Sequence, residues 1–302
     1  MFAKLTLFRI AALPVMPETN RHGEDSPAFA LRYVPAGPTQ ELAYGFVPPR
    51  RCGALLEQAP GGNLLARIRV ETRTVPKPAI DKAAAKMAEA HERDNGRKPG
   101  RKALREMKDA AKLELLPRAF PRVRDAFVLV DVLGSRVWIG ATTSAVVDAA
   151  ITLLTGLFQG MTLDPVVTET RPSAAMAHWL LNDPPQNMNI EESVNLADTS
   201  AERRRATYRN ITPDAPEIVE NVERGMHPVA MAMTRAGRIS FTLHDDLTLT
   251  GVELLDVAVG DEAGPEVDAF DADVAIWTAE VSALLRDLID AMGGEFVPMA
   301  ET

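Results

Sequence analysis

The chain contains little cysteine and few aromatic residues. Its one cysteine, Cys52, can form neither an intramolecular disulfide nor a cluster of thiolate metal ligands. We expect this thiol to be buried and inert in a reducing cytosol. Aromatic residues make up 5% of the chain, which is low for a protein that stacks single-stranded bases on exposed rings.

Signatures of catalysis and of membrane insertion are also missing. The sequence has no glycine-rich phosphate loop, nucleophile elbow, His-Glu-x-x-His or Cys-x-x-Cys motif. His244, Asp245 and Asp246 could offer metal ligands, but such neighbours between two strands more often form a β-turn whose carboxylates bind local amides. We therefore expect no enzyme activity, metal or cofactor, and keep a hydrolase using these three residues as a minor alternative.

No apolar run approaches the roughly 18 residues of a transmembrane helix. Arg9 interrupts the apolar stretch at the N-terminus, so a first strand at Lys4–Ala11 is expected there instead of a signal peptide. The sequence predicts a cytoplasmic protein.

Charge is the most uneven property of the chain. The net charge is −9, yet residues 67–124 carry 17 Lys and Arg against 8 Asp and Glu, while the remainder carries 16 against 34. Local fields, and not the total charge, decide what a surface attracts. This basic stretch therefore predicts an arm that binds a polyanion.

Two helices are expected within the basic stretch. An alternating strand, 64–70, places Arg67 and Arg69 toward solvent and ends at prolines. Helices at 79–93 and 101–115 follow, joined by a short turn, and should form an antiparallel hairpin. Arg101, Arg105, Lys108 and Lys112 recur with helical spacing in one stripe, and Lys82, Lys86 and Arg93 do so on the first helix.

A basic stripe on one helix usually marks no more than a solvated face. Two stripes joined by a basic turn favour a binding surface, and the shortage of aromatic residues favours phosphates over bases. An interaction module whose hairpin binds an acidic protein partner remains the alternative.

The remaining pattern predicts an α+β fold with mixed or antiparallel sheets and flanking helices. Residues 45–49 (Gly-Phe-Val-Pro-Pro) are expected to form a rigid extended turn and no regular element. Strands are predicted at 126–132, 136–141, 163–168, 229–234, 239–243 and 247–255, and helices from 142 or 143, at 173–181, 213–224 and 272–292.

Several short motifs, in order over nearly the whole length, resemble the recombination-associated protein RdgC family. They are Phe2-Ala3-Lys4-Leu5, Phe8-Arg9, Gly45-Phe46-Val47-Pro48-Pro49, the entry to the helical arm at Pro76 to Ile80, Leu115-Leu116-Pro117-Arg118-Ala119-Phe120, Phe270-Asp271-Ala272-Asp273, and the closing helix to Gly293-Gly294-Glu295. The segment Tyr208-Arg209-Asn210-Ile211 departs from the family's pattern, and the arginines at 203–205 are candidates to compensate.

The resemblance implies a non-enzymatic, sequence-independent protein that encircles duplex DNA as a ring-shaped homodimer. Single-stranded DNA is a further candidate ligand. It also implies nucleoid association and a limiting effect on RecA-dependent recombination. The horseshoe-shaped subunit would have a central domain (1–75 and 117–172), a protruding helical tip (76–116) and a base (173–302).

These considerations give two sets of site residues. The dimer-interface set is Leu115, Leu116 and Phe120. The DNA-binding set is Lys77, Lys82, Lys86, Arg97, Lys98, Arg101, Arg105, Lys108, Lys112, Arg118, Arg122, Arg203, Arg204, Arg205 and Arg209.

Overall fold

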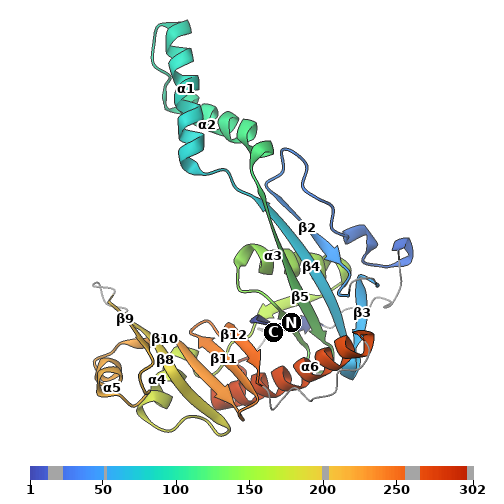
Figure 1. Cartoon of the computed structure of the whole chain (residues 1–302), viewed down its shortest axis with the longest axis vertical. Helices are drawn as coiled ribbons and strands as arrows, with labels where there is room; N and C mark the ends of the chain where they lie inside the picture. The colour runs from blue at the N-terminus through green and yellow to red at the C-terminus, as the bar shows by residue number, and fades with distance from the viewer. Residues whose placement is uncertain (13–22, 51–52, 199–203, 256–265, 298–302) are drawn as a thin grey trace, which may run out of the picture.

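A computed structural model describes residues 1–12, 23–50, 53–198, 204–255 and 266–297 (Figure 1). Two predictions, for Cys52 and Arg203, lie outside these ranges. The described chain has an α+β fold, as predicted, in which twelve strands form one sheet with antiparallel pairing. None of the described helices is long and apolar enough to cross a membrane.

The sheet runs in the order β2-β4-β5-β6-β1-β12-β11-β10-β8-β9, with β3 pairing to β4 and β7 to β1. The strands are β1 (Lys4–Ala12), β2 (Leu42–Val47), β3 (Leu56–Ala59), β4 (Asn63–Arg73), β5 (Pro121–Asp131), β6 (Arg136–Ile139), β7 (Thr162–Pro165), β8 (Met188–Ala197), β9 (Arg205–Arg209), β10 (His227–Arg235), β11 (Ile239–His244) and β12 (Leu249–Leu254). The helices are α1 (Lys77–Asn95), α2 (Arg101–Leu115), α3 (Ser144–Leu157), α4 (Pro172–Leu181), α5 (Pro216–Glu223) and α6 (Glu266–Ala291).

Strand β1 joins the two halves of the sheet, because it pairs with β6 on one side and with β12 on the other. The chain has two apolar cores. Because successive side chains of β4 point to opposite faces of the sheet, Ile68 is buried with α3 in the first core and Leu65 is buried in the second. The second core also contains Trp138 of β6, Phe241 of β11 and Leu284 of α6. The two halves of the chain therefore share one core around α6.

Helices α1 and α2 lie beyond the ends of β4 and β5, at one end of the longest axis of the molecule (Figure 1). We call residues 76–116 the helical arm. Strand β9 and helix α5 lie toward the other end, so the outline of the chain is an open curve. The arm leaves the sheet at the end of β4 and returns at the start of β5, and these two strands are paired from Leu64↔Val130 to Arg73↔Pro121.

Three local predictions were wrong. Residues 45–47 belong to β2, which ends before Pro48, and Gly45 is required there because any Cβ would collide with the backbone of Tyr33. The strand predicted at 163–168 ends at Pro165 as β7. Helix α6 begins at Glu266, ahead of the predicted residue 272.

Strands β3, β8 and β9 were not predicted. In β8 the pairing with β10 shifts register between Ile190 and Val194, which interrupts the alternation of apolar and polar residues that would identify a strand. Strand β9 is a short edge strand in which Ala206 and Tyr208 alone pack against the core, and an alternation this short does not identify a strand.

Candidate nucleic-acid interface

Helix α1 exposes its cations on the side opposite to its buried side. Its alanine-rich sequence favours a helix, which ends at Gly96 in a left-handed conformation (φ 67°). Ala84 is buried, and at 100° per residue Lys82, Lys86 and Arg93 point away from it. All three are exposed. The stripe predicted on α1 is therefore an outward-facing surface.

The stripe predicted on α2 divides into two parts. Lys108 Nζ lies 2.7 Å from Asp81 Oδ1 of α1, and Lys112 Nζ lies 2.6 Å from Glu41 Oε1, just before β2. The hydrogen bond from Lys108 holds the pKa of Asp81 below its usual value. Arg101 and Arg105 are exposed farther out on the same stripe. Lys108 and Lys112 thus hold the arm together, whereas the two arginines face solvent.

The free cations of the arm can now be separated from the paired ones. The turn between the helices contributes Arg97 and Lys98, and Lys77 begins α1. Within the described ranges, these exposed cations of the arm have no ion pair: Lys77, Lys82, Lys86, Arg93, Arg97, Lys98, Arg101 and Arg105.

The segment that leads from the arm into β5 is both basic and apolar. Arg118 and Arg122 are exposed, as predicted for a binding surface. Phe120 is 92% exposed, so its ring does not belong to the core of its own subunit. Leu116 is buried beneath this segment at 1% exposure, and Leu115 is partly buried. Of the three residues predicted for a dimer interface, Phe120 is thus the one that offers a large free surface.

The second basic cluster lies on β9, away from the arm (Figure 1). Arg205 and Arg209 are exposed on this edge strand. Arg204 Nη2 lies 3.0 Å from Asp198 Oδ2, so its charge is partly neutralised. Within one chain the structure does not bring the two predicted clusters together.

Arg67 and Arg69 are not free, although the strand pattern predicted that they would face solvent. Both pair with Asp125 on β5. The pKa of Asp125 is lowered, and the largest cause is the hydrogen bond from Arg69. This pairing joins adjacent strands, since Arg69 lies opposite Asp125 in the β4–β5 ladder. The three residues stabilise the sheet and add little to a DNA surface.

A buried acid lies two residues farther along β4, close to the arm. Glu71 is 3% exposed and accepts a hydrogen bond of 2.5 Å from the Tyr33 hydroxyl and one of 3.1 Å from Arg73 Nε. Burial, together with the hydrogen bond to Glu71, raises the pKa of Tyr33 to about 12. The pKa of Glu71 is lowered, and the largest cause is the hydrogen bond from Tyr33. The carboxylate is thus held charged at the root of the arm.

The prediction of a β-turn at 244–246 is confirmed. Asp246 Oδ1 accepts hydrogen bonds from the Thr248 amide (3.0 Å) and the Thr248 hydroxyl (2.6 Å). His244 Nε2 lies 2.8 Å from Thr250 Oγ1. Across the part of the chain that the structure describes, no group of three or more His, Cys, Asp and Glu residues is arranged to hold a metal ion.

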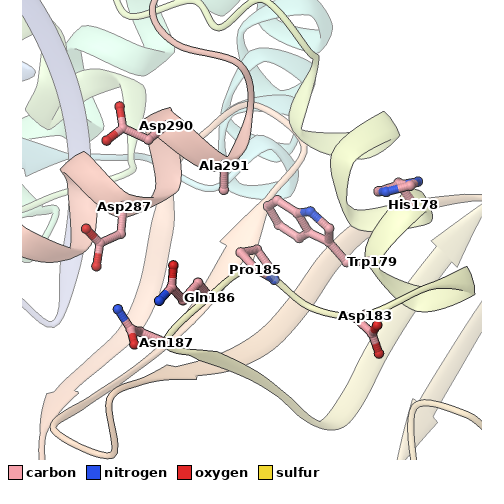
Figure 2. A pocket seen from close by; sticks show the side chains of 9 residues that line it. All are labelled: His178, Trp179, Asp183, Pro185, Gln186, Asn187, Asp287, Asp290 and Ala291. Carbon is pink, nitrogen blue, oxygen red and sulfur yellow. The ribbon is translucent and has the colours of Figure 1, made fainter.

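A cavity of about 450 Å³ lies between the end of α4, the loop after it and the end of α6 (Figure 2). Asp183, Asp287 and Asp290 line it, together with His178 and Trp179. Asp287 is held by Arg235, with 2.7 Å between Oδ2 and Nε. The remaining carboxylates repel phosphate, so this cavity does not belong to a DNA surface.

Comparisons with known proteins point in one direction. The sequence model of a family described as "Putative exonuclease, RdgC" matches residues 2–295. The recombination-associated protein RdgC of Bordetella pertussis is 34% identical over 255 residues, covering 83% of this chain and 85% of that protein. Proteins of the same name from Herminiimonas arsenicoxydans (30% over 267 residues; 87% and 89% covered) and Janthinobacterium sp. (28% over 298 residues; 97% and 98% covered) are also similar.

Proposed function

We propose that this chain, which belongs to the RdgC family, is a recombination-associated protein that binds duplex DNA without sequence preference. The observation that carries the proposal is the set of exposed, unpaired cations on the helical arm. Lys and Arg side chains that neutralise phosphates release condensed counterions, which gives affinity for any DNA sequence. The chain's low aromatic content offers little stacking surface for bases.

The proposed assembly is a homodimeric ring around the duplex, with the arm (76–116) as its tip, residues 1–75 and 117–172 as its centre and residues 173–302 as its base. Phe120 supports this arrangement, because an aromatic ring that is 92% exposed is a suitable anchor for an apolar pocket on a second subunit. A two-fold symmetric ring needs such self-complementary contacts at both ends of the open curve. The two basic clusters, which lie apart in one chain, would then both line one enclosure.

The biological consequence we propose is competition for DNA. A protein that occupies duplex without sequence preference, and single strands to a lesser extent, limits access of the RecA recombinase and associates with the nucleoid. This role requires no bond to be broken. The family description includes the word exonuclease, so the proposal has a direct check: labelled duplex incubated with the protein and Mg²⁺ should stay intact, and release of nucleotides would contradict a purely binding role.

The central test is the salt dependence of binding to a labelled random duplex, followed by fluorescence anisotropy. The logarithm of the affinity should fall linearly with the logarithm of salt concentration, with a slope of about −0.9 per neutralised phosphate. A flat response, or no binding at low salt, would refute the proposal and favour an acidic protein as the partner of the arm. Light scattering with and without duplex should report two chains per particle.

A further inference from the structure

We propose that a cavity between Lys4 of β1 and Arg124 of β5 is an additional binding site for a backbone phosphate of DNA. The inference rests on the proposed function and extends it from the arm onto the central sheet. Neither residue belongs to the sets predicted from the sequence. The experiment below separates failure of this site from failure of DNA binding.

The cavity exists because two neighbouring strands have different lengths. β5 pairs with β6 from Asp131↔Arg136 to Val128↔Ile139, and β6 ends there. The chain then turns away toward α3, while β5 extends back to Pro121. The resulting cavity measures about 420 Å³ and is lined by Lys4, Arg124, Asp125, Gly140, Ala141, Thr142, Thr143 and Val146.

The charges around this cavity are unequal. Lys4 is exposed and, among the described residues, has no ion-pair partner. Arg124 is exposed, and its Nη1 donates a hydrogen bond of 3.2 Å to Thr143 Oγ1, a neutral acceptor that orients the guanidinium without cancelling its charge. The one carboxylate in the lining, Asp125, is already held by Arg67 and Arg69. Two cations therefore face the cavity without a free counter-charge.

The lining chemistry selects phosphate and not a nucleobase. Besides the two cations, the hydroxyl-bearing Thr142 and Thr143 line the cavity, and these groups can donate to phosphate oxygens. The remaining lining residues carry no aromatic ring on which a base could stack. A phosphodiester fits this set better than a free nucleotide would.

The position of the cavity, next to the basic residues of β5, favours DNA as its ligand. Arg122 and Arg124 alternate onto the same face of β5, about 7 Å apart along the strand. Arg118 precedes them in the segment between the arm and β5, and all three are exposed. The basic surface thus runs from the arm along β5 to Lys4, and a duplex bound at the arm would meet the cavity next along this path.

The test compares four proteins by salt-titrated anisotropy: wild type, K4Q/R124Q, the charge-conserving K4R/R124K, and R224Q. Arg224 is an exposed arginine of the base that pairs with Glu220, outside the proposed surface. We expect K4Q/R124Q to reduce the magnitude of the slope by about 1.8 and to weaken binding roughly 60-fold at 0.1 M salt. K4R/R124K should retain the wild-type slope, and so should R224Q.

If the wild type binds with a steep slope and K4Q/R124Q has the same slope, this site is refuted and the proposed function stands. If the wild type does not bind duplex, the proposed function itself fails. A second measurement follows the amide NMR signals of Thr142 and Thr143 during titration with duplex DNA and with inorganic phosphate. Shifts with both ligands in wild type and with neither in K4Q/R124Q support the site, whereas shifts with inorganic phosphate alone would show a small-anion site and overturn the inference.

Discussion

The structure divides one predicted stripe of four cations into two pairs that should behave differently. Arg101 and Arg105 are exposed and unpaired among the described residues, so R101Q/R105Q should remove two phosphate contacts and leave the fold intact. The slope of log affinity against log salt should fall in magnitude by about 1.8, and affinity at 0.1 M salt by roughly 60-fold. The loss should be equal for every DNA sequence, because the contacts do not reach base edges.

The matched control is K108Q/K112Q, which removes the same number of charges from the same helix face. These lysines already pair with Asp81 and Glu41 at 2.7 Å and 2.6 Å, so a phosphate would have to displace a carboxylate from each. We expect a smaller change of slope than for R101Q/R105Q and faster amide hydrogen exchange in α2. Both variants should be measured by anisotropy on two unrelated duplexes. Equal losses in the two variants would refute the division of the stripe.

Three further predictions concern the fold and the assembly. Phe120→Ala should weaken dimerisation on the order of 10-fold to 100-fold, from about 1.5–3 kcal/mol for burying a Phe side chain, as measured by sedimentation. Tyr33→Phe should destabilise the chain by about 1–3 kcal/mol in urea unfolding, because it removes the short hydrogen bond to the buried carboxylate of Glu71 and leaves Arg73 as its side-chain donor. Gly45→Ala should lower the Tm, since its methyl group would displace the backbone of Tyr33 from β2.

Controls and pH dependence sharpen these outcomes. Leu133 is 85% exposed in a turn, so Leu133→Ala should leave dimerisation unchanged, and an equal effect of Phe120→Ala and Leu133→Ala would argue against a specific anchor.

The pKa of Glu71 is lowered from 4.5, so its contribution to stability is complete above that value and is lost as pH falls through the folded pKa. The pKa of Tyr33 is raised to about 12, so its contribution is complete below 10 and is lost as pH rises toward 12. Tyr33→Phe should make the free energy of unfolding less dependent on pH at both low and high pH. Unchanged pH profiles of stability would contradict the Tyr33–Glu71 contact.

The helices of the arm were predictable from local signals. Pro76 and Gly96 mark the limits of α1, and its alanine-rich interior contains no other residue that would break a helix. Gly45 shows the limit of such signals, because the prolines after it suggested a turn while its actual role depends on Tyr33, which is distant in sequence. In β8 the register shift conceals the alternation. Local pattern therefore predicts elements that are regular and self-contained.

The candidate surface was predictable in composition but not in pairing. The spacing of Lys108 and Lys112 identifies the stripe, yet no local rule indicates that Asp81 and Glu41 lie opposite them, because these contacts depend on how α2 packs. Phe120 was predicted for a dimer interface, and only the tertiary structure shows that its ring lies outside the core of its own subunit. Lys4 was missed because the cavity that it lines is formed by strands far apart in the chain.

Glu41 connects the arm to the sheet in two ways, and this explains how a projecting element keeps its direction. Its carbonyl oxygen accepts a hydrogen bond of 2.8 Å from the amide of Arg73, the last residue of β4, and its carboxylate pairs with Lys112 of α2. The side chain of Arg73 in turn donates to the buried Glu71. The end of β4 and the second helix of the arm are thus held by one residue.

Lys112→Gln should therefore act on DNA binding through the orientation of the arm, and Glu41→Gln should produce the same loss although it removes a negative charge. If Glu41→Gln instead strengthens binding, electrostatic repulsion outweighs this orientation.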